Sequence, residues 1–569
     1  MFSFVRITRH AITYSLNYAL TSFFILTLFS AVSLQSVHAQ SDVASSIDAA
    51  VATQFKANEP GATIIVTRDG KMIFRKAYGM ANLEEKTALT PEMTFRLGSV
   101  TKQFTAVAIM MLADQGKLAV SDDIRKYLPD YPTHGKIITV EHLLTHTSGI
   151  VGYTSLPGFQ KVMKDDTSIA KMIDFFKDVP LQFESGTRFE YSNSGYFLLG
   201  AIIEKISSQT YAEFLAKSIF EPLGMRHTAY EGYERNKTKR VEGYSPSKDG
   251  YVKAEAISMG WPYAAGALVS NVDDLALWDA AISAGKLLKP ATWKQTFTPY
   301  KLSDGKSTGY AYGWFVRKIQ GRDSIEHGGG IPGFVTHVIR IPEGKIYVAM
   351  LMNQDAPAAR PDFLAEKIAA IVIGKPYPEF KVITLDTKTL DQFVGLYKAE
   401  DKNTRTISRV DGQLFAQRKS GPKSALQPSS ETEFFLVNSF IRFKFLKNDN
   451  GAVTHLTIFQ NGVEETVPRI SDKPPAERQA IPLAAAAFDA YAGEYQLAPN
   501  FILTITREGD KFMSQATGQS KVEIYAESDT KFFLRVVDAQ LQFVKDGDGK
   551  ITQLILFQGG RGMPAKKIK

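Results

Sequence analysis

Apolar runs at both ends of a long first region predict a sheet built from distant parts of the chain. Ala62–Arg68 and Lys71–Tyr78 are rich in apolar residues and are joined by an Asp-Gly dipeptide, which is typical of a two-residue hairpin turn. Residues 334–341 and 345–352 form a second such pair around a Pro-Glu-Gly turn. Antiparallel strands at both ends, with helices between them, predict one sheet covered by helices.

Helical spacing of apolar positions appears between and beside these strands. Residues 43–57 read as a helix, and Ser99–Gln115 places apolar side chains on one face before Gly116 ends the pattern. Residues 359–373 predict the last helix of this region. The mixture predicts an α/β (α+β) domain over residues 40–375, and the proline-rich linker that follows marks its boundary.

The remainder of the chain is a tandem repeat of short β-rich runs. Three matching stretches share one offset, since Gly395 and Gly493, Phe434 and Phe532, and Phe459 and Phe557 are each 98 residues apart. A register that is kept over a whole unit indicates two copies of one fold. Alternating runs separated by Asp, Gly and Asn turns predict two small antiparallel β-barrels, at residues 386–470 and 484–569.

The N-terminus has the order of a secretory signal peptide over residues 1–39. Arg6 and Arg9 precede an apolar stretch at residues 18–34, and small residues then lead to Ala39 as the predicted cleavage point. An uncleaved membrane anchor is the alternative, although the apolar stretch is short for a spanning helix. We expect a secreted protein, and the bacterial periplasm suits a chain of this size without disulfides.

Composition narrows the chemistry. Hydrophobic residues make up 44% and charged residues 22% of the 569 residues, as in soluble globular proteins. The absence of cysteine excludes disulfides, thiolate metal sites and a cysteine nucleophile. The net charge of +8, or +6 once Arg6 and Arg9 are removed, is scattered along the chain, so we expect no nucleic-acid partner.

Ser99 and Lys102 are the first candidate catalytic pair. They stand three residues apart at the start of a predicted helix, so their side chains share one helix face. A serine hydroxyl needs a neighbouring base, and a lysine serves as one when its pKa is lowered. The same spacing recurs at Ser168, Ser245, Ser303 and Ser420, so the pair by itself is weak.

Two later motifs complete the candidate constellation. Tyr191 and Asn193 form a Tyr-x-Asn motif 92 residues after Ser99, where a phenol can transfer protons and an amide can orient a lysine and a substrate. His327-Gly328-Gly329-Gly330 follows a short apolar run. Glycines at a strand edge let a substrate approach the backbone, and an N–H there can serve as an oxyanion donor.

Other site types find little support in the chain. His142 and His146 have a zinc-binding spacing on a predicted helix, but there is no adjacent glutamate base and no evident third ligand, so a structural role is favoured. There is neither a Gly-x-Ser-x-Gly elbow nor a phosphate-binding Gly-Lys-Ser/Thr loop. We therefore expect no metal and no cofactor.

Taken together, Ser99-x-x-Lys102, Tyr191-x-Asn193 and His327-x-Gly329 resemble the three motifs of the penicillin-recognising serine hydrolases. The resemblance is to the branch of class C β-lactamases, D-alanyl-D-alanine carboxypeptidases, D-aminopeptidases and esterases, and it covers about residues 46–373. Residues 143–149 and 329–334 also resemble that branch. The two repeats resemble the lipocalin-like barrels that follow the catalytic domain of D-aminopeptidase-like members.

The resemblance implies a DD-peptidase/β-lactamase-like fold, with an antiparallel sheet flanked by helices and an all-helical subdomain. It also implies that Ser99 is the nucleophile of an acyl-enzyme mechanism and that Lys102 and Tyr191 handle protons. The backbone N–H groups of Ser99 and Gly330 would hold the oxyanion. Asn193, His327 and Gly329 would complete the substrate site.

One departure from the family pattern bears on the substrate. β-Lactamases and carboxypeptidases of the family usually have lysine where this chain has His327, which is mostly neutral at pH 7. We therefore expect a D-aminopeptidase- or esterase-like hydrolase of amide or ester bonds in small molecules or short peptides. A β-lactamase or D-Ala-D-Ala carboxypeptidase is the alternative.

Two alternatives of another kind remain open. One is a non-catalytic protein that binds peptide or cell-wall fragments, and the other makes the paired barrels the functional part. Residues 151–166 and 230–263 are expected to shape the pocket.

Overall fold

The computed structural model describes residues 42–233, 240–398, 404–418, 422–437, 439–474, 478–498, 501–517, 521–537, 539–558 and 561–569. The predicted signal peptide at residues 1–39 lies outside these ranges. None of the helices within them has the length and apolar character needed to cross a bilayer.

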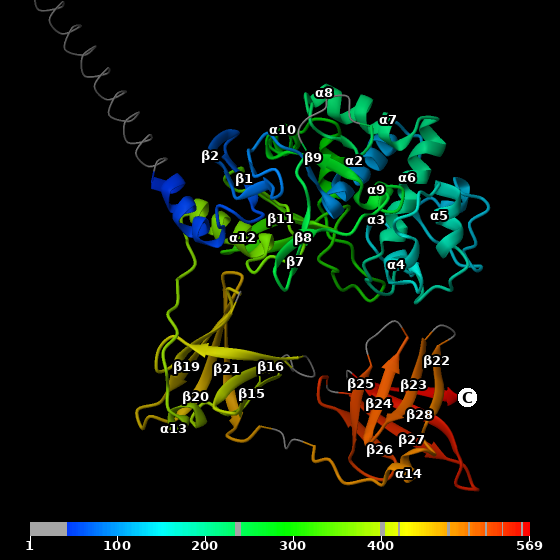
Figure 1. Cartoon of the computed structure of the whole chain (residues 1–569), viewed down its shortest axis with the longest axis vertical. Coiled ribbons are helices and arrows are strands. Elements are labelled where there is room, and N and C mark those ends of the chain that lie inside the picture. Colours follow the sequence, from blue (N-terminus) through cyan, green and yellow to red (C-terminus); the bar gives the residue numbers. More distant parts are fainter. Residues whose placement is uncertain are drawn as a thin grey trace, which may run out of the picture.

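A six-stranded antiparallel sheet forms the centre of the first domain (Figure 1). Its strand order is β10-β11-β12-β13-β1-β2. The β1 strand pairs with β13 in a register that sets Ala62 opposite Met352, so both ends of the domain build one sheet, as predicted. In chain order the strands are β1 (Ala62–Arg68), β2 (Lys71–Tyr78), β10 (Phe315–Ile319), β11 (Arg322–Ile331), β12 (Phe334–Ile341) and β13 (Ile346–Met352).

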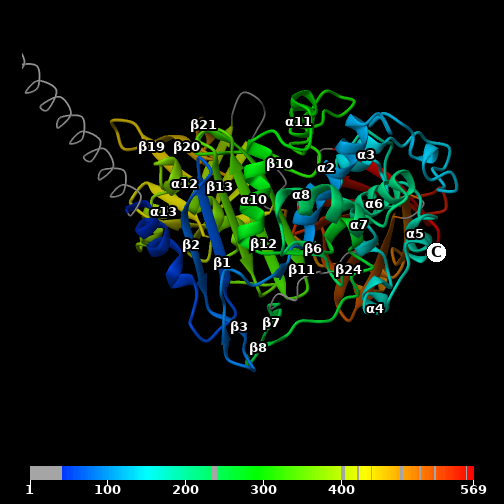
Figure 2. The same cartoon turned by 90° about the horizontal axis from the view of Figure 1, so that it is seen from above.

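Helices cover both faces of this sheet because its central strands are apolar on both sides. Along β13, Val348 and Met350 point into a core shared with α12 (Pro361–Ile373), while Ala349 and Leu351 point into the larger core on the other face. This alternation follows from the two-residue period of a strand. Helix α10 (Val272–Ser283) covers the second face, where it contacts β1 and β13 and lies over the strands in Figure 2.

A helical region stands beside the sheet and is the all-helical subdomain that the resemblance implied (Figures 1 and 2). The buried α6 packs against α2, α3 and α9 in this region. Its helices are α2 (Thr101–Asp114), α3 (Val140–Leu144), α4 (Phe159–Val162), α5 (Ile169–Phe176), α6 (Asn193–Ser207), α7 (Tyr211–Leu215), α8 (Glu221–Leu223), α9 (Tyr263–Gly266) and α11 (Pro290–Thr296).

Short strand pairs connect the two regions. A three-stranded sheet has the order β5-β9-β6, and two further pairs are β3-β4 and β7-β8. They are β3 (Met80–Asn82), β4 (Thr87–Ala88), β5 (Phe95–Arg96), β6 (Ala229–Tyr230), β7 (Tyr244–Ser247), β8 (Gly250–Lys253) and β9 (Leu268–Ser270).

Several element boundaries differ from the sequence prediction. The first helix covers residues 42–51 and continues as a 3-10 turn at Ala52–Gln54, short of the predicted residue 57. The predicted helix from Ser99 begins as a 3-10 turn, Gly98–Val100, before α2. The glycines after His327, predicted at a strand edge, belong to β11 and pair with β12, but they extend beyond the register with β10, which ends at Glu326.

The C-terminal part forms two closed eight-stranded antiparallel barrels, β14 to β21 and β22 to β29 (Figure 1). Equivalent contacts recur at the offset of 98, confirming the predicted duplication. The Tyr397 hydroxyl donates to the Phe393 carbonyl at 2.9 Å, and the Tyr495 hydroxyl donates to the Tyr491 carbonyl at 2.7 Å.

The first barrel follows α13 (Thr387–Asp391) and contains β14 (Gly395–Lys398), β15 (Thr404–Val410), β16 (Gln413–Arg418), β17 (Lys423–Pro428), β18 (Glu433–Leu436), β19 (Arg442–Lys447), β20 (Val453–Gln460) and β21 (Val463–Ser471). The second follows α14 (Ala485–Phe488) and contains β22 (Gly493–Ala498), β23 (Phe501–Glu508), β24 (Lys511–Ala516), β25 (Val522–Ala526), β26 (Lys531–Leu534), β27 (Ala539–Lys545), β28 (Ile551–Gln558) and β29 (Arg561–Lys567).

Among the described residues, the first barrel contacts the first domain through an aromatic stack and through a pair of turns. The Phe440 ring is stacked between Phe363 of α12, at 4.4 Å, and Tyr377 of the linker, at 3.7 Å between ring centroids. Nearby, the Gly321 N–H in the β10–β11 turn donates to the Asn461 carbonyl in the β20–β21 turn at 3.4 Å. Aromatic stacking and turn contacts therefore hold this barrel on the first domain.

Candidate active site

Ser99 lies where a tight backbone turn brings the start of α2 against β11. The turn needs glycine at position 98, which has a φ of +53°. A Cβ at that position would come within 2.8 Å of the Gly330 backbone nitrogen. Gly98, Ser99 and Gly330 all line one pocket, so the two backbone segments expected to hold an oxyanion are brought together.

Lys102 lies directly beneath Ser99 and is completely buried. Its Nζ atom is 3.0 Å from Ser99 Oγ, 2.8 Å from Asn193 Oδ1 and 2.8 Å from the Ala265 carbonyl oxygen. Burial lowers the pKa of Lys102 well below its usual value. A neutral amine has two N–H groups and one lone pair, so the two carbonyl oxygens can take the N–H groups and leave the lone pair for the Ser99 proton.

Tyr191 lies just before α6 and shares its surroundings with both residues. Lys102 Nζ is 4.9 Å from the centroid of the tyrosine ring. Burial raises the pKa of Tyr191, and the neighbouring Ser99 partly offsets that rise. The hydroxyl is buried and makes no hydrogen bond with any described residue. A protonated phenol with a free O–H is suited to donate a proton.

His146 holds the Tyr191 segment in place, which the sequence analysis did not foresee. Its ring lies on the Tyr191 ring, with 4.1 Å between centroids. Its Nδ1 accepts from the Ser192 N–H at 3.1 Å, and its backbone carbonyl accepts from the Glu190 N–H at 2.9 Å. His146 thus contacts Tyr191 and both of its neighbours in the chain.

His142 and His146, whose spacing was weighed as a zinc site and for which a structural role was favoured, do not lie on one helix. Helix α3 ends at Leu144, and His146 adopts a left-handed backbone with a φ of +57°. His142 stays in the helix, where its Nδ1 accepts from the Thr139 N–H at 3.2 Å as part of a capping box. The part of the chain that the structure describes holds no cluster of metal-ligating side chains.

In the third motif, both ring nitrogens of His327 have partners within the protein. Its Nδ1 lies 2.6 Å from the Gly328 carbonyl and its Nε2 lies 3.1 Å from the Tyr310 hydroxyl. The carbonyl requires a proton on Nδ1, so Nε2 accepts from the tyrosine. Burial, with Lys102 nearby, lowers the pKa of His327 to about 3. The ring is therefore neutral and has both nitrogens occupied within the protein.

Gly329 and Gly330 face opposite environments on β11. A Cβ at Gly329 would lie 1.9 Å from the Leu97 carbonyl oxygen, whereas one at Gly330 would meet nothing within 4 Å. The first glycine therefore allows the close packing of β11 on the Ser99 turn. The second leaves room for a substrate.

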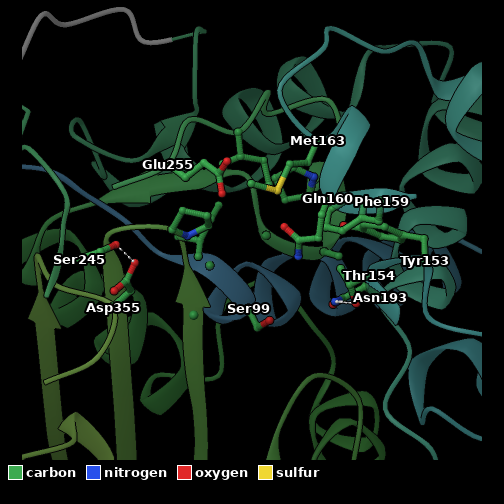
Figure 3. Close-up of a pocket in the computed structure, with 18 residues that line it drawn as sticks. Ser99, Tyr153, Thr154, Phe159, Gln160, Met163, Asn193, Ser245, Glu255 and Asp355 are labelled. Carbon is green, nitrogen blue, oxygen red and sulfur yellow. Dashed lines mark hydrogen bonds between the residues drawn. The ribbon is translucent and has the colours of Figure 1, made fainter. Parts of the chain in front are cut away.

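A pocket of about 330 Å³ opens above Ser99 (Figure 3). The segments 151–166 and 230–263 contribute to it, as expected. Apolar side chains form much of its wall: Tyr153, Phe159, Met163, Ile257 and Pro262. Polar side chains also line it: Thr154, Gln160, Asn193, Ser245, Glu255 and Asp355.

The sequence-predicted residues thus separate into three groups. Ser99, Asn193 and Gly330 line the pocket, and Lys102 and Tyr191 lie buried beside Ser99. His327 and Gly329 pack within the protein and are not among the pocket-lining residues. Their catalytic roles stay predictions. Sequence reasoning missed His146, Glu255 and Asp355, because each is placed by folding and belongs to no catalytic spacing.

Comparison with known proteins matches both parts of the chain to family models. The family model described as "Beta-lactamase" matches residues 47–373, and a domain of unknown function (DUF3471) matches residues 380–471 and 477–564. "Penicillin-binding protein 4*" of Bacillus subtilis is 28% identical over 432 residues, which cover 72% of this chain and 94% of that protein.

Two further similar proteins are a D-aminopeptidase and a penicillin-binding protein homologue. A D-aminopeptidase of Gluconobacter oxydans is 28% identical over 323 residues, covering 56% of this chain and 60% of that protein. The solved structure of an octameric penicillin-binding protein homologue from Pyrococcus abyssi has a TM-score of 0.53 and 27% identity, covering 76% of this chain and 98% of that one. The chain belongs to the beta-lactamase family, a family of serine hydrolases related to the penicillin-binding proteins.

Proposed function

We propose that this chain hydrolyses amide or ester bonds of small substrates through an acyl-enzyme on Ser99. One observation carries the proposal, namely the position of the buried Lys102 amine 3.0 Å from Ser99 Oγ. The same amine donates hydrogen bonds to the carbonyl oxygens of Asn193 and Ala265. A desolvated lysine in this position is the base that a serine nucleophile needs.

The reaction would proceed in two steps, acylation of Ser99 and then hydrolysis of the acyl-enzyme. Lys102 Nζ takes the Ser99 hydroxyl proton while Oγ bonds to the substrate carbonyl carbon, and the N–H groups of Ser99 and Gly330 hold the oxyanion. As the carbon–leaving-group bond breaks, the Tyr191 O–H protonates the leaving group and regains its proton from Lys102. Water then adds to the acyl carbon, and Ser99 leaves with a proton.

The third motif favours the D-aminopeptidase- and esterase-like part of the family. A substrate carboxylate, as in β-lactams or D-Ala-D-Ala peptides, needs a cation beside it, and the His327 ring is neutral with both nitrogens engaged. The similarity to a D-aminopeptidase supports the same preference. We also propose that the protein is exported to the bacterial periplasm, on the basis of residues 1–39.

Covalent labelling of the nucleophile tests the proposal. Wild-type protein treated with a fluorophosphonate should gain one adduct by intact mass, and Ser99→Ala should gain none. Lys102→Arg should also stay unlabelled, because a guanidinium does not give up its proton near neutral pH. Folded wild-type protein that forms no adduct would instead favour a non-catalytic binding protein.

A further inference from the structure

The buried amine of Lys102 depends on a backbone carbonyl that is far away in the chain. Ala265 supplies this carbonyl at 2.8 Å from Lys102 Nζ, and Asn193 Oδ1 is the other carbonyl acceptor at the same distance. Ala265 belongs to the single turn of α9 and also lines the pocket above Ser99. A main-chain carbonyl points where its own segment directs it. Whatever fixes α9 therefore also fixes how the Lys102 amine is oriented.

The first residue of this turn has a strained backbone. Tyr263 has a φ of +37°, in the left-handed region that a residue with a bulky side chain rarely adopts. Such a conformation persists only where the surrounding structure enforces it, and strained residues of this kind gather at functional sites. The carbonyl that Lys102 uses follows two residues later, at Ala265.

Helix α6 provides the surroundings that enforce this conformation. The Tyr263 hydroxyl donates to Glu204 Oε1 at 2.7 Å, and the same oxygen accepts from the Tyr211 N–H at 2.8 Å. The Tyr263 ring is buried against the position of Gly200. A Cβ at that glycine would lie 2.4 Å from Cε1 of the ring and 2.5 Å from the Ala264 Cβ. The helix therefore grips the start of α9 by a hydrogen bond and by close packing.

The same helix carries the second acceptor of the lysine. Asn193 is the first residue of α6, and Glu204 lies further along it. One helix thus sets both carbonyl acceptors of the Lys102 amine, one by a side chain of its own and one through Tyr263. Helix α2 adds a further contact to the turn, because the Thr105 hydroxyl donates to the Ala264 carbonyl at 2.6 Å.

We propose that Tyr263 is a positioning residue for the reaction of Ser99. Its hydrogen bond to Glu204 holds the strained turn of α9, and this turn aims the Ala265 carbonyl at the Lys102 amine. Without the bond the turn relaxes, the carbonyl moves away, and the amine no longer keeps its lone pair on the Ser99 hydroxyl. The inference rests on the proposed function for its effect on catalysis, whereas the position of the carbonyl can be tested by itself.

Four variants isolate the hydrogen bond. Tyr263→Phe removes the hydroxyl and keeps the ring. Glu204→Gln keeps an oxygen that can accept from Tyr263 and Tyr211, whereas Glu204→Met does not. Tyr78→Phe is the matched control, because the Tyr78 hydroxyl also donates to a carboxylate, Asp48, at 2.5 Å, and Tyr78 is not among the pocket-lining residues.

The rate of fluorophosphonate labelling reports on Ser99 without any assumption about the substrate. Tyr263→Phe and Glu204→Met should be labelled about tenfold or more slowly than the wild type, because a small displacement of a catalytic group is costly. Glu204→Gln and Tyr78→Phe should be labelled within about threefold of the wild-type rate. A wild-type rate in Tyr263→Phe would overturn the proposal. Rates that fall in step with the melting temperatures of all four variants would overturn it as well.

A second perturbation reaches the turn by steric pressure. Gly200→Ala places a Cβ against the Tyr263 ring and Ala264, so it should displace α9 and slow labelling about tenfold or more. Gly195→Ala is the control on the same helix, because the nearest atom to its new Cβ, the Leu143 carbonyl oxygen, is 3.4 Å away. Equal labelling rates in these two variants would contradict the role of the turn.

Crystal structures separate this inference from the proposed function. In Tyr263→Phe, the Ala265 carbonyl oxygen should leave hydrogen-bond range of Lys102 Nζ, whereas in Tyr78→Phe it should stay at the 2.8 Å of the present structure. An unmoved carbonyl in Tyr263→Phe would refute the positioning role even if Ser99 is labelled. A wild type without an adduct would refute the acyl-enzyme, and the crystal structures would still decide whether Tyr263 places the carbonyl.

Discussion

At the scale of single residues, the site contains two buried basic side chains, Lys102 and His327, whose neutral forms are favoured by burial. Lys102 suits the proposed role of a base because desolvation favours its neutral form, and His327 is neutral because burial lowers its pKa to about 3. The proximity of Ser99 and Lys102 could be predicted because they are three residues apart at the start of one helix, and Tyr191 could be predicted from the family pattern. His146 and Asp355 could not, since their neighbours come from segments far away in the chain.

His146 is expected to position Tyr191. Substitution by leucine or by asparagine tests whether this depends on the hydrogen bond that His146 accepts from the Ser192 N–H. His146→Leu removes the acceptor for Ser192 N–H and should lower kcat about tenfold or more with little change in KM. His146→Asn keeps a short acceptor and tolerates the left-handed backbone, so it should retain more of kcat. Steady-state kinetics decide this, with His142→Asn as a control. If both variants of His146 lose the same activity in proportion to their loss of melting temperature, its role is only structural.

The pH dependence of the reaction follows from Lys102. The amine must be neutral to accept the Ser99 proton, so kcat/KM should rise with pH through the lowered pKa of Lys102 and then level off. His327, with a pKa of about 3, is neutral from pH 5 to 8 and should add no step there. Profiles of the wild type and His327→Gln should therefore have the same shape between these pH values. An ascending step that only the wild type shows would contradict the neutral His327.

At the scale of elements, strand β11 shows both the strength and the limit of sequence patterns. Neighbouring strands such as β1 and β13 were predicted well because continuous apolar runs indicate strands buried on both faces. The three glycines of β11 were expected at a strand edge, where substrate can approach the backbone, and they do extend beyond the register with β10, which ends at Glu326. On their other side they pair with β12, and the lack of side chains lets β11 press against the Ser99 turn.

Two adjacent glycines provide a test of this packing. Gly329→Ala would set a Cβ 1.9 Å from the Leu97 carbonyl oxygen, so it should cost more than about 2 kcal/mol of unfolding free energy. Gly330→Ala, with nothing within 4 Å of the new Cβ, should change stability by less than about 1 kcal/mol. Thermal or urea unfolding measures both. Similar losses for the two variants would show that β11 does not pack on the Ser99 turn as described.

At the scale of the whole molecule, the duplicated barrels differ in sequence at the residue through which the first one contacts α12. The first uses Phe440, between Phe363 and Tyr377, to hold α12. The position 98 residues later in the second copy is Asp538, which has no ring to stack. The repeat and its barrel fold could be predicted from the internal register. The docking of one copy could not, because it depends on residues that differ between the copies.

Removing the Phe440 ring should loosen the contact between the first barrel and the catalytic domain. In Phe440→Ala, amide hydrogens of α12 should exchange faster, because the helix loses a stacked aromatic neighbour. Those of α6, which lies in the helical region, should exchange as in the wild type. Hydrogen-exchange mass spectrometry measures both helices, with Phe557→Ala in the second barrel as the control. Unchanged exchange in α12 would show that the stack contributes nothing to holding the domains together.

The pairing of β1 with β13 has a consequence for the order in which the protein can fold. Ala62 lies opposite Met352. During synthesis, β1 therefore cannot pair with β13 until the ribosome has added about 290 more residues. Contacts of such long sequence separation form slowly. Each barrel, whose neighbouring strands are mostly consecutive, can form by itself within its own segment. The catalytic sheet therefore stays open through most of synthesis, and its newly made β1–β2 hairpin carries an unpaired apolar edge until residue 352 arrives.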